Sequence, residues 1–237
     1  MKLNKQASKQ FKTVALLPMK ANSTRVPGKN FRNFSGKPLF WWILDTLLEV
    51  DEIDLIVINT DARSLLESHG CYDSSRILIR DRKTNICGDD VSMNLVIKDD
   101  IENVSAGTYL MTHTTNPLLT PETINHAIAT FRDLRLNNGI DSLFSVSRVQ
   151  SRFYTKDCKA INHDPGNLLP TQQLEPWFEE NSNLYIFSSQ SFHSTNARIG
   201  KSPGLFEISK TEAIDIDTPE DWLLAEAVAK SLDCMPQ

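Results

Sequence analysis

Short apolar runs alternate with amphipathic segments of helix length in the part of this chain that precedes Arg148. Such alternation predicts strands that are joined by crossover helices, and these units build a mostly parallel sheet with helices on both faces. We expect strands at Thr13–Met19, Leu55–Asn59, Arg76–Ile79, Thr108–Thr112 and Ser142–Ser147, and helices at Pro38–Glu49, Ala62–Ser68, Ser92–Glu102 and Pro121–Leu134. The predicted fold class is α/β, and the length suits a single domain over residues 1–237.

The pattern breaks down near residues 148–183, where prolines and polar residues replace the apolar runs. A segment of this kind is too irregular for another strand–helix unit, so we predict an inserted arm that serves as a lid or a dimer contact. The alternation then returns with strands near Leu184–Ser188 and Leu205–Ile208. A last helix is expected from Pro219 to about Lys230, with Thr218 as its cap.

Charge and cysteine spacing exclude several classes of protein. The net charge of −5 argues against nucleic acid as a partner. The segment Met1–Lys12 is basic and polar, and Pro18 interrupts the apolar stretch that follows, so neither a signal peptide nor a membrane span is predicted. Cys71, Cys87, Cys158 and Cys234 lie far apart, which fits neither a zinc site nor a disulfide framework. We expect a soluble cytoplasmic protein with reduced cysteines.

A polar, basic loop follows the first predicted strand. The segment Leu17–Asn30 leaves the carboxyl end of that strand, where open α/β sheets bind their ligands. No acidic residue precedes Asp45, so Lys20, Arg25 and Lys29 would concentrate positive charge suited to phosphates. The loop lacks the glycines of a P-loop or a dinucleotide-binding motif. The sequence predicts an anion site here, and an ordinary basic surface loop is the alternative.

Two acids near the C-terminus are candidates for metal binding. Asp215 and Asp217 occupy alternate positions of an extended segment, which would point both carboxylates to the same side. Hard oxygen ligands of this kind suit Mg²⁺. Asp221 falls in the first turn of the last helix, where a helix-start role explains it. The alternative for the pair is a strand end followed by a capped helix.

These two segments together resemble the acylneuraminate cytidylyltransferases and their deoxy-octulosonate relatives. The first is similar to their signature P-A-R-G-G-S-K-x-[IL]-P-x-K-N, and its matching residues are Pro18, Ser23, Pro27, Lys29 and Asn30. The departures are Met19, Lys20, Ala21, Asn22 and Thr24. The second reproduces the family's D-I-D-T-x-x-D element. The resemblance implies a Rossmann-like, mostly parallel sheet of the nucleotide-diphospho-sugar transferase type.

The resemblance also assigns roles to residues. It implies that Lys20, Arg25 and Lys29 are the catalytic cations and that Asp215 and Asp217 bind Mg²⁺. The expected nucleotide-binding residues are Pro18, Met19, Ala21, Asn22, Ser23, Asn30, Arg82, Asp89 and Ser92. No general base is assigned.

The acceptor would lie near the middle of the chain. The segment His113–Leu118 resembles the family's Q-P-T-S-P-[LR], with His113 in place of the glutamine that contacts the acceptor. Arginines such as Arg148 and Arg152 suit an acid group because they bind it through two parallel hydrogen bonds. The expected acceptor-binding residues are His113, Thr115, Asn116, Arg148, Arg152 and Tyr185, although Tyr185 also fits a core position. The segment Asn196–Gly200 resembles an R-I-G stretch, for which a structural role is expected.

The function implied by the resemblance is Mg²⁺-dependent transfer of CMP from CTP to an acidic acceptor, a sialic-acid-like nonulosonic acid, by a homodimer. Pyrophosphate is the other product. One alternative is the same reaction on a deoxy-octulosonate or a small phosphonate, because His113 and Leu119 depart from the sialic-acid pattern. A glycosyltransferase with a D-x-D motif and a non-catalytic nucleotide-binding protein are the more distant alternatives.

Overall fold

A seven-stranded sheet forms the middle layer of this computed structural model, which describes residues 11–233. The strand order is β5-β4-β1-β6-β8-β7-β9. Their bounds are β1 Phe11–Leu16, β4 Leu55–Thr60, β5 Ile77–Asp81, β6 Ala106–Thr112, β7 Ser142–Val149, β8 Trp177–Phe187 and β9 Pro203–Glu207. Within the described residues of this sheet, only β8 runs antiparallel to its neighbours. The predicted α/β class with a mostly parallel sheet is confirmed.

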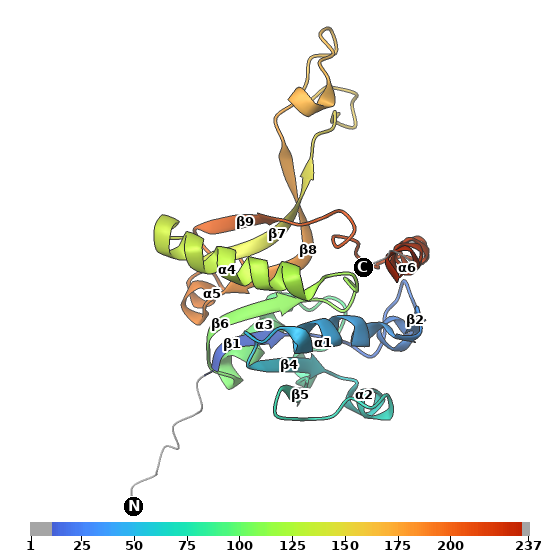
Figure 1. Cartoon of the computed structure of the whole chain (residues 1–237), viewed down its shortest axis with the longest axis vertical. Coiled ribbons are helices and arrows are strands. Elements are labelled where there is room, and N and C mark those ends of the chain that lie inside the picture. The colour runs from blue at the N-terminus through green and yellow to red at the C-terminus, as the bar shows by residue number, and fades with distance from the viewer. Residues whose placement is uncertain (1–10, 234–237) are drawn as a thin grey trace, which may run out of the picture.

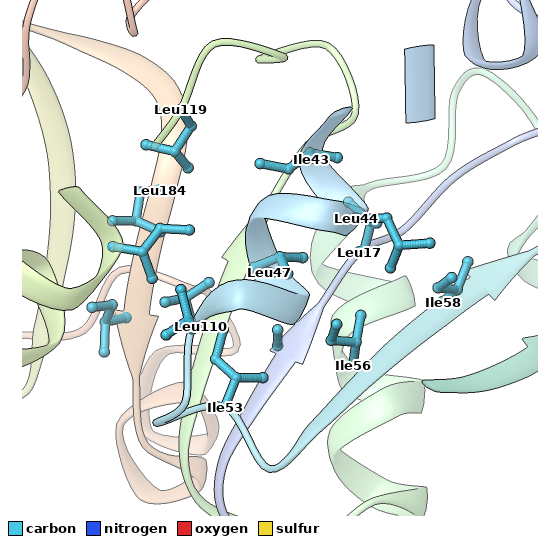
Figure 2. Close-up of a cluster of buried hydrophobic side chains, with 14 of the residues drawn as sticks. Leu17, Ile43, Leu44, Leu47, Ile53, Ile56, Ile58, Leu110, Leu119 and Leu184 are labelled. Atoms are coloured by element: carbon cyan, nitrogen blue, oxygen red, sulfur yellow. The ribbon is translucent and has the colours of Figure 1, made fainter. Parts of the chain in front are cut away.

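Helices cover both faces of the sheet (Figure 1). In β1, Ala15 packs toward α1 and α4, whereas Val14 and Leu16 pack toward α3 and α5. Because side chains alternate along a strand, one apolar run supplies both layers. Figure 2 shows α1 lying over the strands, with Leu47 above Ile56 and Leu110. The helices are α1 Leu39–Glu49, α2 Arg63–Ser68, α3 Met93–Asn103, α4 Pro121–Asn138, α5 Ser189–Thr195 and α6 Pro219–Asp233.

The C-terminal helix α6 packs on a small hairpin rather than on the main sheet. The hairpin pairs β2 (Asn33–Phe34) with β3 (Lys37–Pro38). The Phe34 and Trp222 rings meet edge to face with centroids 5.4 Å apart, and Ile216 is fully buried in the same cluster. This third apolar cluster therefore holds the segment before α6 against the loop that follows β1.

An arm projects from the end of the sheet (Figure 1). The outer halves of β7 and β8 form an antiparallel ribbon, in which Val149 pairs with Trp177, and residues 150–176 form the tip. The register shifts between Phe144 and Val146, as in a β-bulge. Bulges bend and twist a strand pair, which accounts for the departure of the ribbon from the sheet.

Most predicted elements are present. One strand begins earlier than predicted, and two further elements were not predicted. β8 begins at Trp177 rather than near Leu184, because its outer half is stabilised by pairing with β7 and not by burial. The short helix α5 and the β2–β3 hairpin were not predicted, since each presents few apolar residues in a recognisable period. Residues 1–10 and 234–237, with Cys234, lie outside the described residues. No helix within residues 11–233 has the length and hydrophobicity needed to cross a bilayer.

Candidate active site

A cleft with a volume of about 250 Å³ opens at the edge of the sheet where β1, β4, β5 and β6 end. These strands are parallel, so their carboxyl ends meet there. From β1 the chain moves outward through β4 and β5 and then returns to place β6 on the other side of β1, so the strand order reverses between β1 and β6. This is the switch point at which open α/β sheets bind ligands. Of the predicted site residues, those that line the cleft are Pro18, Met19, Lys20, Ser23, Arg25, Lys29, Asn30, Arg82, Asp89, His113, Thr115 and Asp217.

The loop after β1 is fixed by its own polar groups. Gly28 adopts a left-handed conformation (φ 64°) and starts a short 3₁₀ turn, Lys29–Phe31. Asn30 is buried, donates to the carbonyl of Lys20 at 2.8 Å and accepts from the Thr114 hydroxyl at 2.7 Å. Its amide is thus engaged by the protein itself, so Asn30 braces the loop at the floor of the cleft.

Lys29 joins this loop to the predicted metal-binding segment. Its side chain is only 10% exposed, and its ammonium group donates to the carbonyl of Ile216 at 2.6 Å and lies 3.3 Å from a carboxylate oxygen of Asp217. The other oxygen of Asp217 lies 3.0 Å from the Arg25 guanidinium. Two motifs separated by nearly the whole chain therefore meet as one charge cluster, in which two cations flank one carboxylate.

Asp215 lies behind Asp217, outside the residues that line the cleft. Burial raises the pKa of the Asp215 carboxyl, an effect that the Thr115 side chain opposes and the charge of Asp217 reinforces. Its Oδ1 atom is buried without a hydrogen-bond partner among the described residues. A buried carboxylate oxygen without a donor favours a cation nearby. The two carboxylates are thus a donor set that fits Mg²⁺.

Asp221 fixes the backbone beside this pair. Its Oδ2 atom accepts from the backbone of Asp217 at 3.1 Å and from the backbone of Thr218 at 2.7 Å. The Thr218 hydroxyl in turn accepts from the backbone of Asp221 at 3.3 Å, which is a reciprocal helix cap. The predicted helix-start role of Asp221 is confirmed, and the same contacts hold Asp217 in place.

Two exposed residues of the cleft lining, Lys20 and Asp89, form an ion pair. The Lys20 ammonium holds the pKa of the Asp89 carboxyl below its ordinary value. Phosphates that enter the cleft would compete with Asp89 for this cation. The pair therefore connects the loop after β1 to the segment before α3.

Three other predicted nucleotide-binding residues lie outside the cleft lining. The backbone of Ala21 donates to the Asp61 carboxylate at 2.7 Å. Asn22 is exposed on the loop. Ser92 caps α3 by accepting from the backbone of Asn94 at 3.3 Å. In this structure Ala21 and Ser92 serve to hold the loop and the helix that border the cleft.

Arg82 is held in the cleft wall by a buried polar network. Its guanidinium donates to Asn59 Oδ1 at 3.0 Å and to the carbonyl of Met19 at 3.0 Å, and burial lowers its pKa. Asn59 is fully buried and donates to Asp100 at 2.8 Å. Asp100 forms an ion pair with Arg80, which also pairs with Asp99. The network therefore connects a cleft cation to two buried acids on α3.

We expect Asp100 to make stability depend on pH. Burial raises the pKa of its carboxyl from 3.8 to about 6, although Asn59 and Arg80 oppose the shift. The folded state then binds more protons than the unfolded state between these values, so stability falls as pH rises through them. Relative to Asp100→Asn, the wild type should lose about 1–3 kcal/mol of unfolding free energy from pH 4 to pH 7. Urea titrations would measure this, and parallel curves for the two proteins would contradict it.

The predicted acceptor residues divide between the cleft and the arm. His113 is partly buried, and burial, together with Arg198 and Lys29, lowers its pKa to about 3. Asn116 is buried outside the lining and donates to the carbonyl of Ile214 at 3.3 Å. Arg148 is exposed on the outer part of β7, and Arg152 donates to the carbonyl of Leu169 at 2.7 Å within the arm. Neither arginine reaches the cleft of its own chain.

Tyr185 belongs to the core beneath the cleft. It is 1% exposed, and its ring packs with the apolar cluster on the α3 side of the sheet. Burial raises its pKa to about 12, and its hydroxyl donates to Glu180. The core position foreseen as its alternative is the one that the structure gives it.

Comparison with known proteins agrees with this geometry. The family model described as Cytidylyltransferase matches residues 14–229. The chain belongs to this family. It is therefore a nucleotidyltransferase, and the resemblance drawn from the two motifs is confirmed.

Relatives and solved structures cover nearly the whole of this cytidylyltransferase. The CMP-N,N'-diacetyllegionaminic acid synthase of Legionella pneumophila is 30% identical, and the match covers 91% of this chain and 95% of that protein. A pseudaminic acid cytidylyltransferase of Campylobacter jejuni is 22% identical over 93% of this chain and 97% of its own length. The structure of CMP:2-keto-3-deoxy-manno-octonic acid synthetase superposes with a TM-score of 0.65 at 14% identity, covering 93% and 99% of the two chains. The last match supports the fold alone.

Sequence reasoning missed part of the cytidylyltransferase site. One wall of the cleft is apolar and comes from the start of α3 and the segment before it, through Ile86, Val91, Met93 and Val96. The polar network behind Arg82 was also missed, because in the sequence Asp99 and Asp100 cannot be distinguished from acids on the solvated face of a helix. Arg198, which approaches His113, was visible only as the arginine of the R-I-G stretch.

Proposed function

We propose that this cytidylyltransferase transfers CMP from CTP to a hydroxyl group of a sialic-acid-like nonulosonic acid, with release of pyrophosphate. The observation that carries the proposal is the charge cluster of Lys29, Arg25 and Asp217 in the cleft at the switch point of the sheet. The names of the relatives support the acceptor class, since they act on legionaminic and pseudaminic acids.

The proposed step is a substitution at the α-phosphorus of CTP. A hydroxyl oxygen of the acid attacks that phosphorus, and the bond between the α-phosphorus and the bridging oxygen breaks. The bond electrons leave with pyrophosphate, and the hydroxyl proton passes to solvent. Such a reaction asks mainly for positioning and for neutralisation of the charge on the phosphates. Lys20, Arg25 and Lys29 supply fixed positive charge around the space available to the triphosphate.

We also propose that Mg²⁺ binds at Asp215 and Asp217. Mg²⁺ usually takes one or two carboxylates and completes its ligands with water and substrate phosphates, so this pair is sufficient. When bound, the ion would neutralise part of the triphosphate charge. The unpartnered Oδ1 atom of Asp215 supports the assignment. From the need for CTP we further infer a cytoplasmic location.

A panel of acids tests the proposed function. Wild-type protein, CTP and Mg²⁺ are incubated with sialic, legionaminic, pseudaminic, deoxy-octulosonic and small phosphonic acids, and pyrophosphate release is measured. We expect release with a nonulosonic acid and none without an acid. Release only with the octulosonic acid or a phosphonate would move the assignment to those acceptors. Silence with every acid would contradict the proposed acceptor class.

We further propose that the chain is a homodimer assembled through the arm. The arm carries apolar side chains that are largely exposed in a single chain, among them Leu168 at 63% and Leu169 at 44%. Exposed apolar groups gathered on a projecting element favour a protein contact. An arm that reaches a second subunit would also bring Arg148 and Arg152 toward the partner's cleft, which is how these predicted acceptor residues would act.

Charged substitutions in the arm test the proposed dimer contact. We expect the double variant Leu168→Asp, Leu169→Asp to shift the protein from dimer to monomer in light scattering, because two carboxylates in an apolar interface are costly to desolvate. Leu136→Asp, at a position 84% exposed on α4, is the matched control and should remain dimeric. A wild-type protein of monomer mass would overturn the proposal.

A further inference from the structure

We propose that Arg198 binds the carboxylate of the acceptor acid and so selects acids over neutral sugars. The inference rests on the proposed function and names the residue that recognises the acid group. The sequence pointed instead to Arg148 or Arg152, which lie in the arm, and it gave the stretch around Arg198 a structural role.

Arg198 is placed by a tightly anchored loop that follows α5. Three consecutive backbone amides hold the loop to the start of β7: Gly200 donates to Ser142 at 2.8 Å, Lys201 to Asp141 at 2.8 Å and Ser202 to Asp141 at 3.1 Å. A side chain at residue 200 would collide with Asp141, since a Cβ there would lie 2.2 Å from its Oδ1. The glycine thus permits a close approach that fixes the position of the arginine two residues earlier.

The guanidinium lies over a buried ring. Its central carbon is 3.8 Å from the centroid of Tyr185, a cation–π contact. The Arg198 side chain is 20% exposed, so it is shielded from bulk water without being sealed off. A stacked guanidinium of this kind is held in one plane, and little conformational freedom remains to be lost when an anion binds.

The hydrogen-bonding capacity of Arg198 is only partly used. Its Nη1 atom lies 3.4 Å from His113 Nε2 and 3.8 Å from Met111 Sδ, and its Nη2 atom lies 3.5 Å from Glu180 Oε1. All three contacts are long, whereas a guanidinium carries five N–H donors arranged to match a carboxylate. By comparison, Arg25 and Lys20 each have a close carboxylate partner, and Lys29 donates to the carbonyl of Ile216 at 2.6 Å.

His113 connects this cation to the cleft. The imidazole lines the cleft, and because arginine can only donate, its Nε2 atom must be the acceptor and Nδ1 must hold the proton. A neutral imidazole here leaves the positive charge of Arg198 available to the acceptor. Glu180 is the competing carboxylate and also accepts from the Tyr185 hydroxyl, but its side chain is 42% exposed and lies 3.5 Å from the Arg198 Nη2 atom, so an acceptor carboxylate can replace this long contact. A carboxylate beside His113 would then meet Arg198 on the side of the cleft that adjoins α5.

The test compares an active acid with its carboxamide, in which the carboxylate is replaced by a neutral amide. We expect Arg198→Gln to raise the KM for the acid by about 10- to 100-fold, with the KM for CTP within about twofold of wild type. The carboxamide should be a much poorer substrate than the acid for the wild type, and the two should be nearly equal for Arg198→Gln. Arg198→Lys keeps the positive charge but loses the paired N–H donors of the guanidinium, so its KM for the acid should lie between those of the wild type and Arg198→Gln.

Arg132→Gln is the matched control, because Arg132 lies on α4, pairs with Glu52 and is outside the cleft lining. It should behave like the wild type. Equal losses with the acid and the carboxamide in Arg198→Gln would indicate a structural role and overturn the inference, while wild-type turnover would leave the proposed function intact. Absence of wild-type turnover with every acid would overturn both.

Discussion

Replacing Lys29 with methionine should lower kcat/KM by about 1,000-fold, the scale seen when a preorganised charge-stabilising donor is removed. The Lys29 side chain is nearly buried in the cleft wall, where its ammonium group donates to the carbonyl of Ile216 and lies beside Asp217. Methionine has a similar length and no charge, so it removes the electrostatic contribution and leaves the packing largely intact. Steady-state pyrophosphate release, with CTP and acid both varied, would measure the loss.

Lys37→Met is the matched control for this variant. Lys37 also pairs with an acid, Asp45, but it lies on the β2–β3 hairpin away from the cleft. We expect the control to retain its activity and both variants to unfold at temperatures near that of the wild type. Activity of a folded Lys29→Met protein within tenfold of the wild type would contradict the role given to Lys29.

Asp217→Asn should have an effect of similar size, about 1,000-fold on kcat/KM. The substitution keeps the shape of the side chain but removes the charge that offsets Lys29 and Arg25, and it weakens the proposed Mg²⁺ site. Binding of Mn²⁺ as a probe, followed by electron paramagnetic resonance without CTP, separates these effects. We expect Mn²⁺ affinity to fall at least tenfold because one of two carboxylate ligands is lost.

Asp45→Asn is the control for this measurement, since it removes one carboxylate from a partly exposed ion pair outside the cleft. Its Mn²⁺ binding and its activity should match those of the wild type. If Asp217→Asn lost activity and kept its Mn²⁺ affinity, Asp217 would act through Lys29 and Arg25, and the metal assignment would be wrong.

The fold could be predicted because its strands carry their signal locally. The run Leu55–Ile58 is apolar throughout, as expected of a strand buried on both faces, and it lies within β4. The outer half of β8 has no such signal: Glu179 and Glu180 pair with Ser147 and Val146 across the arm, a contact that depends on residues more than 30 positions away. Pairing of this kind is a property of the folded chain.

The candidate site also contains residues that a local motif predicts and residues that only the packing of distant segments brings in. Lys29 and Asp217 were predicted because each lies in a short motif, and the structure brings the two together. Asn59 is a polar residue at the end of a buried strand, and Asp100 and Arg198 lie in segments where polar residues usually face solvent. Their positions follow from burial under neighbouring elements, as when Arg80 and Asn59 enclose Asp100 between β4, β5 and α3. Motifs therefore identified the centre of the site, and packing determined its surroundings.

Isotopic labelling of CTP tests the central claim most directly. The wild-type protein is incubated with Mg²⁺ and an active acid, once with CTP labelled at the α-phosphorus and once with CTP labelled at the γ-phosphorus. The proposed function predicts that the α label appears in a CMP–acid conjugate and the γ label in pyrophosphate, in equal amounts. An α label that stays in CTP, or that appears only as free CMP, would contradict transfer to the acid.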